Sequence, residues 1–287
     1  MRTDIAYVNR LGERVEFGGS DESLHYMEHE LRDWKWSWRT GVAGRVTGFS
    51  RRSSKPQELR FPVGIAAATG AEGIELRNLV EGIGDVDVAA GEPGWLYVGD
   101  WYVRCWIVGC EPTDYWMDDR IAELELTVLV EQLGWVSETL QAFVPETGDE
   151  EASGTDFPLD FPFEFARGRT SKTVYNSGTS PQDLLIRVYG PATDPAVSIG
   201  GNVYQVNVDV PAGYRLEVDS MARTVRLIAP DGTWADAYGS REPGAEGSGT
   251  YIFERIAPGA STVAWGNDFA FDLVRYDVRM ACPWEEA

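Results

Sequence analysis

The chain has 287 residues, of which 43% are hydrophobic and 25% charged, a globular balance with length enough for two domains. Acidic residues outnumber Lys and Arg by 46 to 25, giving a formal net charge of −21 at pH 7. Such a surface favours solubility and repels nucleic acid and anionic membranes. A second interpretation is an acidic face lining a passage for DNA, since a basic lining would hold the phosphates.

The first 65 residues are expected to form strands. Residues 5–8 are short and apolar, and residues 14–17 alternate, with Val15 and Phe17 on one face. A further strand is predicted over 58–67.

Three tryptophans mark the segment LRDWKWSWR at 31–39. Its period of two over a full strand length puts Trp34, Trp36 and Trp38 on one face. We expect this face to pack in the core. The alternative is a subunit contact, because tryptophan is favoured in interfaces.

One helix of about 12 residues is predicted next. Thr69 and Glu72 have the spacing of a capping box, and Gly82 and Gly84 are expected to stop the helix. Its apolar stripe consists of Leu76, Leu79, Val80 and Ile83. Such a helix would cover one side or end of a sheet.

A hairpin and a long strand follow the helix. Residues 95–98 and 101–108 flank Gly99-Asp100, a two-residue loop that favours a primed turn. Residues 120–131 alternate strictly, which favours a strand although AELEL alone is compatible with a helix.

Composition suggests two domains joined by a linker. Residues 145–155, PETGDEEASGT, have linker composition, and the prolines of DFPLDFPFEF at 156–165 forbid a regular sheet interior. We therefore expect a first domain over 1–145, a linker and Pro/Phe-rich segment over 146–165, and a second domain over 166–287.

The second domain is predicted to be a β-sandwich. Apolar and polar side chains alternate over 184–189, 205–210 and 214–219, with glycine, proline and aspartate between the strands. Further strands are expected over 251–256, 262–265 and 269–280. The predicted fold class is thus all-β and mainly antiparallel, with one helix.

The two histidines of the chain suggest one possible metal site. His25, Glu28 and His29 lie in HYMEH, which matches the H-x-x-E-H pattern of zinc enzymes when it lies on a helix. We find no third ligand, and the segment runs directly into the tryptophan-rich stretch. A polar strand or loop is therefore the preferred interpretation, and a metalloenzyme is the alternative.

Other chemistry is not indicated. G-x-S-x-G, a Walker loop and G-x-G-x-x-G after a strand do not occur in the sequence. Cys105, Cys110 and Cys282 have no C-x-x-C spacing, so neither a disulfide framework nor a zinc site is expected. The N-terminus lacks an apolar secretory core, and we expect no signal peptide and no membrane span. We predict no enzymatic activity, no cofactor and no bound metal.

Several segments, in order and spacing, resemble a known family. These are ELRNLVEGIGDVDV, GWLYVGDWYVRCWI and TVLVEQLGWV in the first domain, DFPLDFPFEF between the domains, and YNSG, LLIRVYGPATDPAVSIGGNVYQVNVDVPAGYRLEVDS, RTVRLIAPDGT and FERIAPGASTVAW in the second. Together they resemble the distal tail proteins (Dit) of siphophages over nearly the full length.

This resemblance implies a fold and a function. It implies a tail-tube-like β-barrel or sandwich with one helix, followed by a galectin-like, carbohydrate-module-like β-sandwich. It further implies a virion protein, assembled in the bacterial host cytoplasm, that forms a homo-hexameric hub. The implied partners are the tail tube protein, a tail hub or tip protein and a receptor-binding protein. DNA would pass through the central channel without specific binding.

A carbohydrate-binding module that acts in host attachment is the alternative function. Sugar sites stack a pyranose ring on exposed aromatics, and Trp234, Tyr238 and Trp265 are the candidates. A position in the core or at the sandwich rim is the preferred interpretation of these three side chains.

Overall fold

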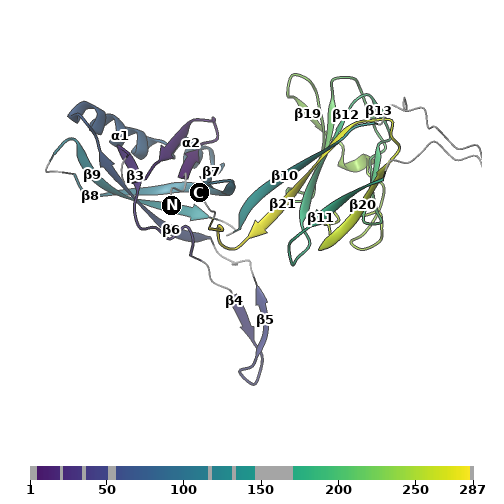
Figure 1. The fold of residues 1–287 in the computed structure, drawn as a ribbon, viewed down its shortest axis with the longest axis horizontal. Helices are drawn as coiled ribbons and strands as arrows, with labels where there is room; N and C mark the ends of the chain where they lie inside the picture. The colour runs from purple at the N-terminus through teal and green to yellow at the C-terminus, as the bar shows by residue number, and fades with distance from the viewer. Residues whose placement is uncertain are drawn as a thin grey trace, which may run out of the picture. The chain divides into compact units, whose positions relative to one another are not determined.

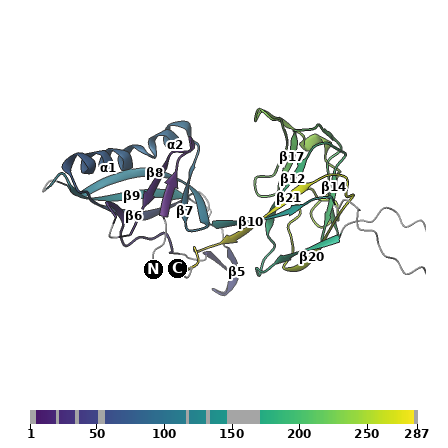
Figure 2. The same cartoon turned by 45° about the horizontal axis from the view of Figure 1, so that its top comes forward.

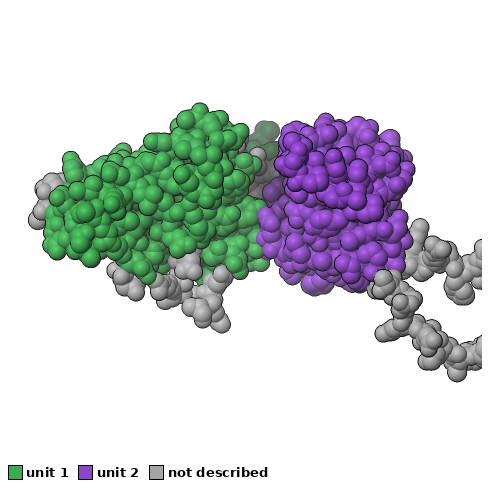
Figure 3. All heavy atoms as spheres, turned by 90° about the horizontal axis from the view of Figure 1, so that it is seen from above, with its two compact units in different colours: residues 1–137, 278–287 green, residues 138–277 purple. Residues whose placement is uncertain are grey.

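The computed structural model describes residues 5–19, 22–33, 37–50, 56–115, 118–130, 134–145 and 171–284. The chain forms two compact units, shown in Figure 3. Unit 1 comprises residues 1–137 and 278–287, and unit 2 comprises residues 138–277. The predicted class, all-β and mainly antiparallel, is confirmed.

Unit 1 is a sheet with two arms that share one long strand (Figure 1). Its strands are β1 (Ile5–Val8), β2 (Arg14–Phe17), β3 (Leu24–Tyr26), β6 (Gln57–Ala66), β7 (Gly94–Val98), β8 (Trp101–Asp114) and β9 (Ile121–Val130). One arm has the order β2-β1-β7-β8, and the other has the order β3-β6-β9-β8. The arms do not close into a barrel, so the barrel alternative is not realised in the described strands.

Alternating side chains build the core of unit 1. On β9, Ala122, Leu124, Leu126, Val128 and Val130 are all buried, as the period of two predicts. The strands predicted over 5–8 and 14–17 are β1 and β2, with Val15 and Phe17 in the same core.

The predicted helix is α1 (Gly70–Gly82), which lies against β6 and β9 (Figure 2). The capping box forms: the Glu72 amide donates to Thr69 Oγ1 at 3.2 Å, and Glu72 Oε2 accepts from the Ala68 amide at 2.9 Å. Val80 is buried against the sheet, whereas Leu79 is exposed. The buried stripe is therefore narrower than the sequence predicted.

A second helix, α2 (Asp85–Ala90), was not predicted from the sequence. A buried carboxylate ties it to β1. Asp87 accepts hydrogen bonds from the Tyr7 hydroxyl at 2.5 Å and from the Arg10 amide at 2.8 Å. Gly94 passes so close that a Cβ there would lie 2.6 Å from both Asp87 Oδ2 and the Tyr7 hydroxyl, so only glycine fits. Burial, with the bond to Asp87, raises the pKa of Tyr7 well above its usual range.

The predicted β7–β8 hairpin is confirmed. Val98 pairs with Trp101, which leaves Gly99 and Asp100 as a two-residue loop with φ +60° at Gly99. A positive φ at the first loop position is the feature of a primed turn that glycine supplies without strain.

A separate hairpin of β4 (Ser37–Thr40) and β5 (Val46–Ser50) also belongs to unit 1. It replaces the continuous strand predicted over 31–39. Leu31 is buried in a turn, and the strand begins only at Ser37. Trp38 is 56% exposed, so its predicted place in the core is wrong. Trp34 and Trp36 lie outside the described residues.

Unit 2 is a sandwich. One sheet has the order β19-β18-β17-β12-β21-β10, the other has the order β11-β20-β14-β15, and β13 pairs with β16. The strands of the first sheet are β10 (Trp135–Phe143), β12 (Asp183–Tyr189), β17 (Arg215–Asp219), β18 (Thr224–Ile228), β19 (Trp234–Asp236) and β21 (Phe271–Arg279). The others are β11 (Ser171–Asn176), β13 (Ala192–Thr193), β14 (Ala196–Ile199), β15 (Asn202–Gln205), β16 (Asp209–Val210) and β20 (Gly259–Trp265), besides a 3-10 turn, η1 (Tyr238–Ser240).

Two strands predicted in unit 2 differ in the structure. The segment 205–210 breaks after β15, because the Asn207 amide bonds to the carbonyl of Ser240 instead of continuing a ladder. The segment 251–256 is irregular, because the amide of Tyr251 donates to the side chain of Asn202. Both segments still bury apolar residues.

The two units have different bounds from the predicted domains. Phe143, at the end of β10, lies in the core of unit 2, and Cys282 lies in the core of unit 1. The chain thus passes between the units within β10 and again within β21. The segment 146–165, predicted to link domains, lies outside the described residues, and the described residues on both sides of it belong to unit 2.

Candidate functional sites

The HYMEH segment does not form the helix that a zinc site needs. His25 lies on β3, and Glu28 and His29 lie in the irregular segment that follows. The His29 ring packs near Phe61 at 5.9 Å between centroids, and burial lowers its pKa. No three metal-binding side chains gather within the described part of the chain. The metalloenzyme alternative therefore lacks its geometry.

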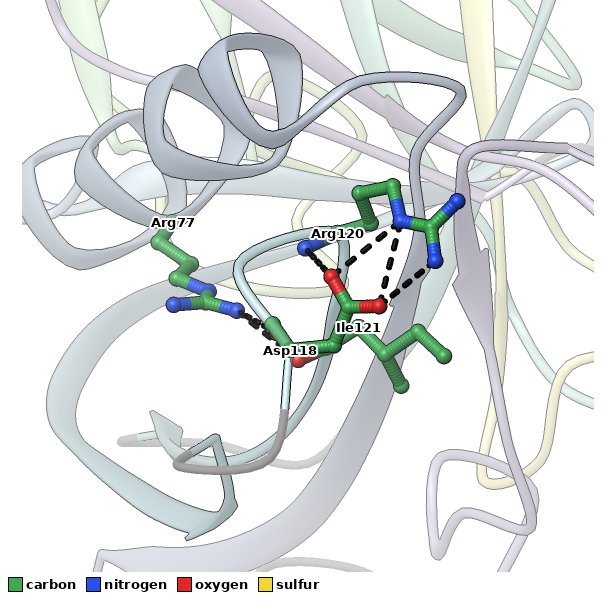
Figure 4. A network of polar contacts seen from close by, with 4 residues as sticks. All are labelled: Arg77, Asp118, Arg120 and Ile121. Carbon is green, nitrogen blue, oxygen red and sulfur yellow. Dashed lines mark hydrogen bonds and ion pairs between the residues drawn. The ribbon is translucent and has the colours of Figure 1, made fainter.

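Charged groups beside α1 form a structural clasp (Figure 4). Arg77 donates to the carbonyls of Asp118 and Ile121 at 2.9 and 2.8 Å. The guanidinium of Arg120 bonds the Asp118 carboxylate at 2.6 Å and, as the main cause, lowers its pKa to about 2. These contacts hold the turn before β9 against the helix and leave Asp118 engaged within the protein.

The cysteines are not arranged as nucleophiles. Cys105 and Cys282 are buried, and burial raises the pKa of the partly exposed Cys110 to about 11. A thiol with so high a pKa carries little thiolate at neutral pH. Among the described helices, none is long and apolar enough to cross a membrane.

Unit 2 carries a groove beside its edge strand β19. Its volume is about 410 Å³, and two of the three aromatic residues predicted from the sequence line it, Trp234 and Tyr238. Trp265 lies elsewhere: it is only 3% exposed and packs edge-on against Phe143 and Phe271 in the core. Trp265 therefore offers no ring to a ligand, in agreement with the core interpretation.

The two groove aromatics differ in how much ring they present. The ring of Tyr238 already has two partners, the guanidinium of Arg241 at 3.7 Å from its centroid and the stacked ring of Phe253 at 5.7 Å. Trp234 is 57% exposed and has the guanidinium of Arg226 at 4.4 Å. Trp234 is thus the better stacking surface.

Sequence reasoning missed the arginines of this groove. Arg223 and Arg226 line it, Arg241 covers Tyr238, and none of the three forms an ion pair with a described residue. Arg226 lies in register with Glu217, but Glu217 already accepts from Arg187 and Arg215, each at 2.9 Å. Strand register creates this arrangement, and no spacing in the sequence reveals it.

The β4–β5 hairpin presents a second exposed aromatic surface. Trp38 and Phe49 are cross-strand partners, and Phe49 is 70% exposed. Every described side chain from Ser37 to Phe49 is at least partly exposed. Large apolar side chains exposed together indicate an interaction surface.

Solved structures match this chain over both units. The Dit protein of phage SPP1, described as a paradigm of the hub adsorption apparatus in phages that infect Gram-positive bacteria, matches with a TM-score of 0.55 and 11% identity. The match covers 96% of this chain and 99% of that one. The chain has the Dit fold.

Two baseplate structures extend the match. Chains of the phage P2 baseplate in its activated conformation, with calcium and with strontium, match with TM-scores of 0.56 and 0.58 at 9% identity. Each match covers 98% of this chain and 100% of the matched baseplate chain. No protein-family model and no curated protein matches the sequence. The chain and these three structures thus share a fold at 9–11% sequence identity.

Proposed function

We propose that the chain is a structural protein of a phage tail, a baseplate hub of the siphophage distal tail type. The observation that carries this proposal is the match of both units, in one chain and in the same order, to the Dit fold. A chain that shared only a sandwich with these proteins would support much less, because sandwiches serve many functions.

The hub is proposed to be a homo-hexameric ring in the virion. It joins the tail tube protein to a tail hub or tip protein and to the receptor-binding protein, and its channel passes DNA. Six copies with a net charge of −21 carry −126 formal charges, which opposes adhesion of DNA to the ring. The proposed role is non-enzymatic, because the solved structures that share this fold are described as an adsorption hub and a baseplate.

Mass photometry and electron microscopy of the purified chain test the ring. Six copies of 31.8 kDa give an expected particle of about 191 kDa with a central opening. Antibody labelling of virions is expected at the tail end distal to the capsid. A chain that stays monomeric, together with virions that lack it, would contradict the proposal.

A second candidate function is carbohydrate binding by unit 2. It is favoured by the exposed indole of Trp234 in the groove and by the neighbouring arginines, which suit a sugar that carries an acidic group. Calorimetry with neutral and acidic glycans tests it, comparing the wild type with Trp234→Ala. Trp284→Ala is a matched control, because Trp284 is also exposed and has the guanidinium of Arg32 at 3.9 Å. Binding unchanged in Trp234→Ala, or absent for every glycan, would exclude this site.

A further inference from the structure

The β4–β5 hairpin lacks the burial that normally holds such a structure together. Its two strands pair only with each other, and no described side chain from Ser37 to Phe49 is buried. The register puts Trp38, Phe49 and Val46 on one face, since Trp38 pairs with Phe49 and Thr40 with Val46. An isolated two-stranded hairpin is marginally stable in water. Its apolar face therefore lacks a covering partner within the described part of this chain.

The hairpin is also basic within an acidic protein. The sequence from 34 to 57 holds six of the 25 Lys and Arg residues and no acidic residue, which leaves 19 basic against 46 acidic residues elsewhere. Arg39 and Arg45, on the described hairpin, form no ion pair with any described residue. We call residues 37–50 the basic arm.

Unit 1 also carries four acidic residues that strand pairing places opposite one another. Strand pairing places Glu111 opposite Glu125 and Asp114 opposite Glu123 on β8 and β9. Like charges directly opposite each other destabilise a sheet. Arg60 neutralises Glu125 at 2.6 Å, but Glu111, Asp114 and Glu123 have no ion pair among the described residues. These four acids are the acidic stripe.

We propose that the basic arm of one copy docks on the acidic stripe of the next copy. Arg39, which the alternation places on the face opposite Trp38, and Arg45, in the turn of the arm, would supply the cations that the stripe lacks. The occupant is a second copy because the two unmatched surfaces have complementary charge and belong to one chain. A contact between two different surfaces of identical chains is head-to-tail, the type that closes rings. This inference rests on the proposed hub function and identifies its subunit contact.

Charge exchange tests the contact by mass photometry over a concentration series. Arg39→Glu with Arg45→Glu is expected to raise the dissociation constant between copies at least about tenfold, as is Glu111→Arg with Glu123→Arg. The variant with all four substitutions is expected to recover assembly, because each attraction is restored with reversed sign. Arg14→Glu with Arg255→Glu is the matched control for the arm variant: both arginines are partly exposed, and the change in net charge is the same as in Arg39→Glu with Arg45→Glu.

Thermal unfolding separates docking from misfolding. The basic arm has no described buried side chain, so its variants are expected to unfold at the wild-type temperature. Assembly unaltered in the arm and stripe variants, with a wild type that does form rings, would overturn the docking while leaving the hub intact. A monomeric wild type would overturn both, and DNA binding that the arm variants abolish without loss of assembly would assign the arm to DNA.

Discussion

The Tyr7 hydroxyl and the Asp87 carboxylate meet at 2.5 Å inside unit 1, where both residues are fully buried. This bond joins the first strand to a short helix 80 positions later in the chain. A buried carboxylate is stable only when its oxygens accept hydrogen bonds, so the pair anchors α2.

Tyr7→Phe is expected to destabilise unit 1 by about 1.5–3 kcal/mol, because it leaves one Asp87 oxygen buried without its donor. Urea denaturation measures the loss. Tyr26→Phe is the control, since that hydroxyl has no hydrogen bond to a described residue, and its effect should stay within ~0.5 kcal/mol. Equal effects of the two variants would contradict the anchoring role.

The cap of α1 gives a second prediction. Thr69→Ala removes the acceptor of the Glu72 amide and is expected to cost about 1 kcal/mol of unfolding free energy, whereas Thr69→Ser should keep the bond. Hydrogen exchange at the first turn of the helix reports the difference locally. Similar losses for alanine and serine would show that the hydroxyl is not the stabilising group.

Truncation of Trp265 should reduce the free energy of unfolding far more than truncation of Trp234. Trp265→Ala opens a cavity beside Phe143 and Phe271 and is expected to cost ~3–5 kcal/mol. Trp234→Ala removes a largely exposed ring and should change stability by less than about 1 kcal/mol. Chemical denaturation of both variants checks the placement, and a stable Trp265→Ala protein would contradict it.

The clasp beside α1 predicts a pH dependence. The pKa of Asp118 in the folded state lies below its ordinary value, so the clasp is complete above about pH 4 and weakens as the pH falls toward 2. Arg120→Gln removes the principal cause and should move this pKa up toward 3.8. Carboxyl-carbon NMR titration measures it. Asp231, whose pKa is lowered by bonds from Thr233, should not move in this variant.

Cys110 should be a slow thiol. Because burial, and then the charge of Glu81, raise its pKa to about 11, its alkylation rate should still rise with pH above 9. Glu81→Gln is expected to lower the midpoint pH of the rise in the Cys110 alkylation rate. The buried Cys105 and Cys282 should stay unmodified in the folded chain. A rate that levels off near pH 9 would contradict the prediction.

Features set by neighbouring residues were predicted best from the sequence. The capping box of Thr69, the alternation of β9 and the Gly99 turn depend on local spacing, and all three form as expected. The full-length resemblance to Dit proteins was likewise recovered at the level of the fold.

Features set by distant partners were missed. A strand is predicted over 251–256, but the amide of Tyr251 donates a hydrogen bond to the side chain of Asn202, 49 positions away. Trp38 lies in a tryptophan pattern typical of a core face, yet its strand leaves the sheet and pairs only with β5. The arginines around Trp234 come together through strand register, which a single sequence does not specify.

Because the chain enters unit 2 through β10, leaves through β21 and then places Cys282 in the core of unit 1, unit 2 is an insertion within unit 1. Recombination that exchanges unit 2 as a module would need two crossovers, one within β10 and one within β21, to preserve the core of unit 1. A single crossover would also replace residues 278–287, and with them Cys282 of the unit 1 core.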